Sequence, residues 1–203
     1  MCDPAPVGDS APPLVLLISG SGPHRSGVWD LDACLTGDIL AASQLLWVDG
    51  VLRKGWEVMV LNPNQPHAFR GPVSSRAVRN VPFCWEEFVE GRGRSAHSDV
   101  YVIAHGTGAQ RAVDLLEEYD AARERVRKVA FLNGVFRMAS EDVSRILSER
   151  GRNWVPCSLP LDEEPPYHPV KLVMTCASAS CTDPALMGGV CLDSVLRFLG
   201  EPK

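Results

Sequence analysis

The chain has 203 residues, 45% of them hydrophobic, and a formal net charge of −5. This size and composition suit one globular domain with a sizeable core. With a pI of about 5.5, the chain is a poor candidate for direct nucleic-acid binding, because that affinity depends on Lys and Arg neutralising phosphates. We expect no transmembrane helix and no membrane association, since the sequence has no run of about twenty apolar residues.

The N-terminal segment differs in composition from the rest of the chain. Residues 1–13 are polar and proline-rich, and they lack the basic start and apolar centre of a signal peptide. We therefore predict a flexible tail at residues 1–13 and a single domain at residues 14–203.

The seven cysteines are odd in number and include no Cys-x-x-Cys pair. This usage favours reduced thiols in an intracellular compartment. Cys176, Cys181 and Cys191 are close in sequence, but their spacing is not typical of a zinc site, so we expect them to pack as small apolar residues. The sequence predicts no metal and no cofactor.

Strands and helices alternate along the chain. Short apolar, β-rich runs predict strands at residues 14–18, 56–61, 100–103, 128–132, 153–157 and 171–177. Helical spacing of apolar residues predicts helices at residues 37–54, 81–90, 109–119, 140–150 and 190–199. This alternation predicts an α/β fold with a mostly parallel central sheet and helices on both faces.

A glycine-rich turn follows the first predicted strand, at Ser19, Gly20 and Ser21. An α/β-hydrolase places an amide of its oxyanion hole at this point of the fold. The motif is too short to indicate a nucleotide site. The alternative is a tight exit from the strand that requires glycine torsions.

Two connections are long for a compact domain. Residues 67–80 show no periodicity and are basic, and residues 159–169 are rich in proline. Long connections are often functional, so both are candidate contact surfaces, and the alternative is that both are ordinary solvated loops. The cations at Arg123, Arg125 and residues 127–128 are more typical of a solvated helix end than of a nucleic-acid site.

Residues 99–109 have the layout of a nucleophile elbow, which is a buried strand, a tight turn and a helix. In the pattern small-x-nucleophile-x-small, Ala104 and Gly108 are the small residues and Gly106 takes the nucleophile position. Glycine has no side chain that could attack a substrate. The sequence therefore predicts an α/β-hydrolase-like fold without its nucleophile.

The other triad positions are also incomplete. On this fold the acid and then the histidine follow the nucleophile in the chain, and the histidine lies after the last strand. No histidine follows residues 171–177; the five are His24, His67, His97, His105 and His168. Asp162 lies where a triad acid would lie, but without a histidine to orient we interpret it as a turn residue.

An atypical catalytic apparatus is the alternative to inactivity. Cys84, Thr107 or His105 would then serve an esterase-like reaction, because nucleophiles are recognised by geometry and not by sequence position. We favour a structural, hydrogen-bonded role for His105 near the turn. A further alternative is a small-molecule sensor that retains the hydrolase pocket without its chemistry.

Four segments in order resemble the Argonaute-binding (Arb) domain family. They are Leu-Leu-Ile-Ser-Gly-Ser-Gly-Pro at 16–23 with Ser-Gly-Val-Trp at 26–29, Gly-Trp-Glu-Val-Met-Val-Leu-Asn-Pro-Asn at 55–64, Val-Ile-Ala-His-Gly at 102–106, and Asn-Trp-Val at 153–155 with Pro-Leu-Asp at 160–162. The resemblance runs from about residue 14 to residue 198. Members of the family include a subunit of an Argonaute chaperone complex, a domain of fungal class II histone deacetylases and an animal cotranscriptional regulator.

The resemblance implies a role in gene silencing, chromatin or RNA-linked regulation through protein partners, in a deacetylase-type or silencing complex in the nucleus. Many members carry serine in place of Gly106 and a His-Glu pair after the last strand. This chain has Cys181-Thr-Asp183-Pro in that region. We therefore expect a vestigial active-site region without catalysis, made up of Ser19, Gly20, Ser21, His105, Gly106, Thr107, Asp162 and Asp183.

Overall fold

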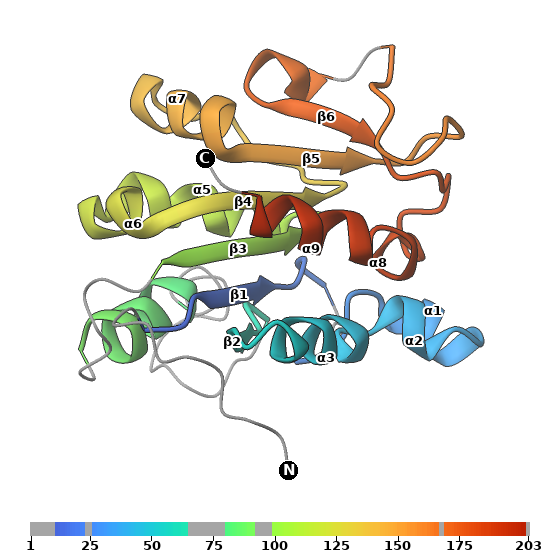
Figure 1. Cartoon of the computed structure of the whole chain (residues 1–203), viewed down its shortest axis with the longest axis horizontal. Coiled ribbons are helices and arrows are strands. Elements are labelled where there is room, and N and C mark those ends of the chain that lie inside the picture. Colours follow the sequence, from blue (N-terminus) through green and yellow to red (C-terminus); the bar gives the residue numbers. More distant parts are fainter. Residues whose placement is uncertain (1–10, 23–25, 65–79, 92–98, 167–168, 202–203) are drawn as a thin grey trace.

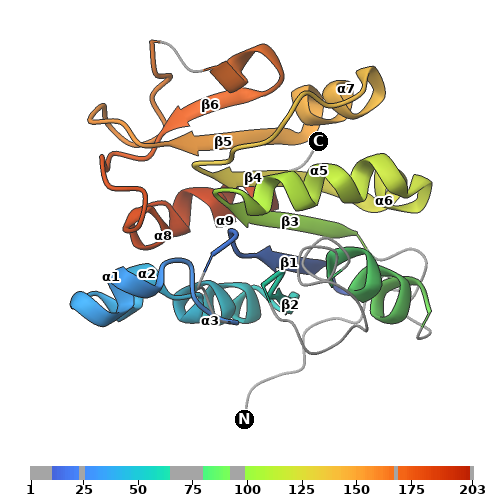
Figure 2. The same cartoon turned by 180° about the vertical axis from the view of Figure 1, so that it is seen from behind.

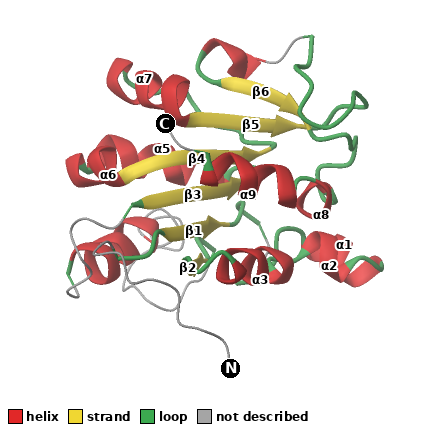
Figure 3. Cartoon of the chain, viewed as in Figure 1, coloured by secondary structure: helices red, strands yellow, loops and turns green. Residues whose placement is uncertain are grey.

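The computed structural model describes residues 11–22, 26–64, 80–91, 99–166 and 169–201. Its described part is built on a sheet of six strands in the order β2-β1-β3-β4-β5-β6 (Figure 1). The strands are β1 Leu14–Ile18, β2 Glu57–Leu61, β3 Val100–His105, β4 Val126–Leu132, β5 Gly151–Val155 and β6 Thr175–Ser178. Each strand pairs with its neighbours in parallel, as the arrows of Figure 3 show.

Helices cover both faces of this sheet. On one face lie α5 (Gly108–Glu118), α6 (Asp120–Arg125) and α7 (Glu141–Arg150), which are in front in Figure 2. The other face, in front in Figure 1, carries α3 (Leu45–Arg53), α8 (Met187–Val190) and α9 (Leu192–Gly200). The predicted α/β-hydrolase-like fold class is confirmed.

The alternation of side chains along β1 divides the core into two layers. Leu14, Leu16 and Ile18 pack with residues of α5 and α7. Val15 and Leu17 pack with residues of α3 and α9. Strands buried on both faces read as continuous apolar runs, which is why these segments were recognisable in the sequence.

The strand before the elbow lies inside the sheet. β3 pairs in parallel with β1 on one side and with β4 on the other. The helix that follows it, α5, buries one face through Ala109, Ala112, Val113, Leu115 and Leu116. The predicted central position of the elbow strand is therefore confirmed.

The single helix predicted at residues 37–54 is wrong. The chain instead forms α1 (Leu31–Thr36), α2 (Ile39–Ala42) and α3. The Asp30 and Asp38 side chains cap α1 and α2 by accepting from the amides of Ala33 and Ala41. Backbone hydrogen bonds from residue 29 to residue 42 and from residue 44 to residue 27 interrupt the helix between α2 and α3.

Other boundaries also differ from the sequence prediction. The segment predicted as a helix at 81–90 is helical from residue 80, and it ends in a π-helix, η1 (Trp85–Glu90). The last strand starts later than residue 171, because residues 169–172 form a 3-10 turn, η2 (Pro169–Leu172). The cations at 127–128 lie in β4 rather than at a helix end, where Arg127 pairs with Asp99 at 2.7 Å.

The connection at 159–169 is not a free loop in its described part. The amide of Asp162 donates to the carbonyl of Ser178 at 3.0 Å, and the amide of Ser178 donates to the carbonyl of Glu163 at 2.7 Å. This connection therefore continues the hydrogen bonding of β6. Of the other predicted segments, residues 1–10 of the tail and residues 67–79 of the basic loop lie outside the described residues.

Candidate functional site

The elbow has the backbone of a nucleophile turn but no side chain at its tip. Gly106 joins β3 to α5 with a φ of +53°. Its amide donates to the carbonyl of Leu132 at 2.9 Å, and its carbonyl accepts from the amide of Val135 at 3.0 Å. A β-carbon built at Gly106 would meet no atom within 4 Å. The position therefore has space for a side chain and carries none.

Gly108 shows why the elbow needs small residues. A β-carbon there would lie 2.6 Å from the carbonyl oxygens of Ile18 and Ser19. Those oxygens belong to the backbone at the end of β1, which cannot move aside without disturbing the sheet. Close contact between the elbow helix and the β1 exit is therefore built into the sequence.

The glycine-rich turn after β1 lies directly against the elbow. The amide of Ser21 donates to the hydroxyl oxygen of Thr107 at 2.6 Å. Asn64 holds the same turn from the other side, because its side chain donates to the carbonyl of Gly20 at 2.7 Å and accepts from the amide of Gly22 at 3.1 Å. The Ser21 amide, which a hydrolase would offer to an oxyanion, thus has a partner within the protein.

Ser19 is fully buried beneath this turn. Its hydroxyl donates to the carbonyl of Val28 at 3.1 Å and accepts from the side-chain amide of Gln44 at 3.0 Å. These bonds tie the end of β1 to the start of α3. The geometry assigns Ser19 a structural contact rather than a place at the surface of the site.

Among the described residues, His105 is the histidine that lies at the candidate site. Its ring is nearly buried and lies 5.8 Å from the ring of Trp29. The Nε2 atom is 3.1 Å from the carbonyl oxygen of Pro184, and since a carbonyl only accepts, Nε2 donates. His105 thus ties the elbow strand to the loop after β6. The other four histidines of the chain lie outside the described residues.

Asp162 does not face a histidine in the described part of the chain. It has a φ of +70°, and its Oδ1 accepts from the indole of Trp154 at 2.9 Å and from the hydroxyl of Ser194. The carboxylate therefore links β5 to α9. Asp183 is exposed, and its Oδ1 accepts from the amide of Ala185 at 2.9 Å at the turn before α8.

The structure therefore brings together only part of the predicted site. The turn at 19–21 and the elbow at 105–107 meet, and His105 joins them to the loop that contains Asp183. Asp162 instead contacts Trp154 and Ser194. Sequence reasoning missed Asn64 as a support of the glycine-rich turn, although the Asn-Pro-Asn segment was visible as a motif.

The alternative nucleophiles have little chemical support. Cys84 packs against the core cluster beneath α5, and burial raises the pKa of its thiol, which lowers the fraction of reactive thiolate. The hydroxyl of Thr107 accepts from the amide of Ser21 rather than donating to a base in that contact. Activation of either group requires a base that withdraws its proton.

The described ranges contain neither a group of side chains suited to a metal ion nor a helix suited to crossing a membrane. Within those ranges, no cluster of three or more His, Cys, Asp or Glu side chains is arranged to hold a metal ion. None of the helices in the same ranges has the length and apolar run needed to cross a bilayer.

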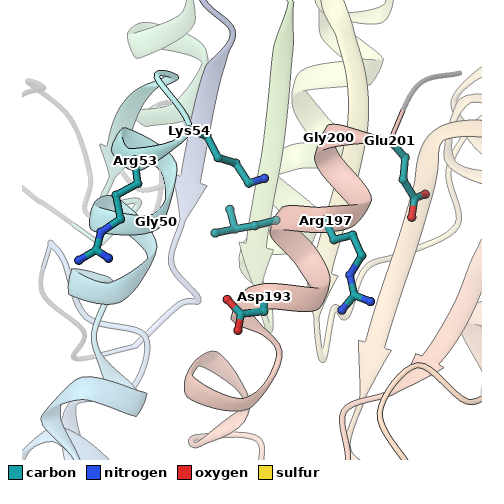
Figure 4. A pocket seen from close by; sticks show the side chains of 8 residues that line it. Gly50, Arg53, Lys54, Asp193, Arg197, Gly200 and Glu201 are labelled. Atoms are coloured by element: carbon teal, nitrogen blue, oxygen red, sulfur yellow. The ribbon is translucent and has the colours of Figure 1, made fainter. Parts of the chain in front are cut away.

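A groove lies away from the elbow, between the C-terminal half of α3 and helix α9 (Figure 4). Its volume is about 560 Å³. Its walls carry charges of both signs, and the lining residues are Gly50, Arg53, Lys54, Asp193, Leu196, Arg197, Gly200 and Glu201. Because α3 leads into β2, this groove lies toward the amino ends of the strands, opposite the elbow.

Several proteins similar to this chain in sequence are named cotranscriptional regulators. The chain is 22% identical to a cotranscriptional regulator ARB2A homolog of Xenopus tropicalis, across 73% of this chain and 49% of that protein. It is 21% identical to the cotranscriptional regulator ARB2A of Homo sapiens, with the same coverage. The chain thus spans about half the length of these curated relatives. No family model matches the chain.

Two solved structures share the fold. A histone deacetylase from Saccharomyces cerevisiae superposes with a TM-score of 0.58 and 12% identity, over 93% of this chain and 79% of that one. The histone deacetylase Clr3 superposes with a TM-score of 0.59 and 14% identity, over 94% of this chain and 32% of that one. Together with the sequence relatives, these matches confirm the predicted resemblance to the Arb domain family.

Proposed function

We propose that this Arb-like domain is catalytically inactive and acts through protein partners. It serves as an interaction or scaffold subunit in a gene-silencing, chromatin or RNA-linked regulatory complex of the nucleus. Neither a metal nor a cofactor is needed for that role.

The glycine at the tip of the elbow is the observation that carries this proposal. Gly106 occupies the position where the fold presents its nucleophile, and it offers no reactive atom. The groups around it support the same reading, because the Ser21 amide and the His105 ring are bonded within the protein. Loss of one triad member already reduces the rate by a factor of about 10⁴ or more.

The names of the relatives support a regulatory setting. The ARB2A proteins are named cotranscriptional regulators, and the two proteins of similar structure are named histone deacetylases. A net charge of −5 favours protein partners over nucleic acid. These observations support a role in a deacetylase-type or silencing complex.

Affinity purification from the native cell, followed by mass spectrometry, tests the proposal. We expect co-purification of deacetylase, Argonaute or other chromatin subunits. The control is a tagged, unrelated α/β domain expressed at the same level. Recovery of no protein beyond those found with the control would refute the scaffold role.

A further inference from the structure

One surface of the domain exposes large apolar side chains on neighbouring helices. Helix α2 packs against α1 on one side and against α8 on the other, and Figures 1 and 2 show these helices together beside α3. We call this surface the apolar patch. Its residues, with their exposed fractions, are Leu35 (75%), Ile39 (56%), Leu40 (52%), Leu45 (59%), Leu52 (55%) and Val190 (42%).

The side chains of the apolar patch are not part of the two core clusters. The inward face of α3 is provided by Trp47 and Val51, which are fully buried. Leu45 and Leu52 are seven residues apart, so they share the outward face of the helix. Helix α7 shows the ordinary pattern for comparison, because all its exposed residues are polar: Glu141, Asp142, Arg145, Ser148 and Glu149. Large apolar side chains that are exposed on several helices in contact with one another are typical of interaction sites.

The charge around the apolar patch is negative. Residues 30–54 contain four aspartates against two cations, Arg53 and Lys54, and Asp49 pairs with Arg53 at 2.8 Å. Asp32, Asp38 and Asp49 are exposed. The pKa of the Cys34 thiol, which lies among them, is raised by burial and then by the charges of Asp30 and Asp38. An occupant of this surface therefore gains from positive charge next to its own apolar side chains.

We propose that the apolar patch binds an amphipathic helix of a partner protein, whose apolar face is flanked by lysine or arginine residues. Helices with apolar residues at i, i+3, i+4 and i+7 present such a face. This inference rests on the proposed function, because it names the kind of partner segment through which a scaffold domain would act. Leucine side chains of the partner would cover the patch, and its cations would face Asp32 and Asp38.

A second copy of this chain is a poorer occupant. In a two-fold dimer the same patch lies on both sides of the interface. Asp32 and Asp38 would then be present twice at the interface, and like charges at an interface disfavour association. Charge complementarity therefore favours a different, basic partner.

Three model peptides test the chemistry of the occupant, with binding measured by fluorescence anisotropy. One is an amphipathic helix of leucine and lysine, the second replaces lysine by glutamate, and the third keeps lysine but replaces leucine by alanine. We expect binding of the leucine–lysine helix only, weakened by salt because the charges are exposed. Equal binding of the alanine–lysine helix, or no binding of the leucine–lysine helix, would overturn the proposal.

Matched variants locate the binding site. Ile39→Ser with Leu40→Ser changes the patch, whereas Met138→Ser with Leu172→Ser changes apolar residues that are 96% and 93% exposed elsewhere. We expect the patch variant to weaken binding of the leucine–lysine helix by about tenfold or more and the control variant to leave it unchanged. Equal affinities of the two variants would contradict the inference, as would a wild-type dimer, seen by sedimentation, that the patch variant dissociates.

The same two variants separate this inference from the proposed function. In affinity purification from the native cell, we expect the patch variant to lose a partner that the control variant retains. If both variants recover every partner, the inference fails and the scaffold role stands. If no variant or wild-type protein recovers any partner while the model helix still binds the patch, the scaffold role fails instead.

Discussion

At Gly106 the elbow has space for a nucleophilic side chain but carries none. A side chain at this position would meet no atom within 4 Å, but its φ of +53° is strained for any residue with a β-carbon. After β6 the chain contains no histidine, and the His105 ring is hydrogen-bonded to Pro184. A hydroxyl placed at this position would need a base within about 3 Å to become a useful nucleophile.

We predict that Gly106→Ser folds and remains unreactive. The strain at positive φ lowers the free energy of unfolding by about 1 kcal/mol, and a fluorophosphonate probe does not label the variant. Urea unfolding and gel-based labelling measure the two results, with an active serine esterase as the positive control for the probe. Labelling of the variant would show that a base is present and would contradict the prediction.

Gly108 is expected to respond differently from its neighbour. In Gly108→Ala the new methyl group lies 2.6 Å from two backbone carbonyl oxygens, and such overpacking lowers the free energy of unfolding by about 1 to 3 kcal/mol. Gly106→Ala is the matched control, because its methyl group meets no atom and its only cost is the strain of the positive φ, about 1 kcal/mol. Urea unfolding that gives Gly108→Ala the same midpoint as Gly106→Ala, or a higher one, would argue against close packing of the elbow on β1.

Cys191 gives the molecule a pH dependence in the alkaline range. Burial, Asp162 and Cys181 raise the pKa of its thiol from 9.0 to about 12. The folded state therefore holds this proton more tightly than the unfolded state, and the stabilisation is present below pH 9 and is lost as the pH rises toward 12. The native thiol is also a poor nucleophile for the same reason.

We predict that the difference in the free energy of unfolding between the wild-type protein and Cys191→Ala falls by about 1 to 2 kcal/mol between about pH 8.5 and about pH 10.5. Urea unfolding of both proteins at several pH values provides the measurement, and taking the difference removes the other titrating groups that the two proteins share. A difference that is constant over this range would mean that the thiol has an ordinary pKa in the folded state.

At the scale of elements, Asp162 links the connection after β5 to two packed elements. Its carboxylate accepts from Trp154 of β5 and from Ser194 of α9, and its amide extends the hydrogen bonding of β6. A triad acid would instead orient a histidine. Removing an acceptor from a buried indole donor leaves that donor without a partner, which is destabilising.

We predict that Asp162→Asn unfolds close to the wild-type midpoint, whereas Asp162→Ala loses about 2 kcal/mol or more. Asparagine keeps an acceptor for Trp154 and tolerates the positive φ, and alanine does neither. Glu149→Ala, on the exposed face of α7, is the control for a lost surface charge. If Asp162→Asn destabilised the protein as much as Asp162→Ala, the carboxylate charge rather than the acceptor would be what matters.

Local patterns were sufficient for most elements and insufficient where distant backbone groups decide the structure. The apolar run of β3 and the spacing of apolar residues in α5 predicted both elements from neighbours in sequence. The interruption between α2 and α3 depends on bonds to residues 27–29, which no local pattern contains. The support of the glycine-rich turn by Asn64 is likewise a contact between distant segments.

For the whole molecule, the sequence located the elbow, its missing nucleophile and the adjacent turn. It did not reveal the apolar patch, because the predicted single helix at 37–54 placed Ile39, Leu40, Leu45 and Leu52 on one broad apolar surface. Two separate helices, α2 and α3, turn these four side chains outward instead. Exposure of this kind follows from tertiary packing, which single-sequence periodicity does not report.

Hydrolysis of short p-nitrophenyl esters by the purified protein tests the inactivity of the elbow most directly. With Gly106 at the nucleophile position, the release of p-nitrophenol is expected to match that of Thr107→Ala and Cys84→Ala and to exceed buffer by no more than an unrelated protein does. Turnover by the wild-type protein that disappears in either variant would contradict a non-catalytic elbow.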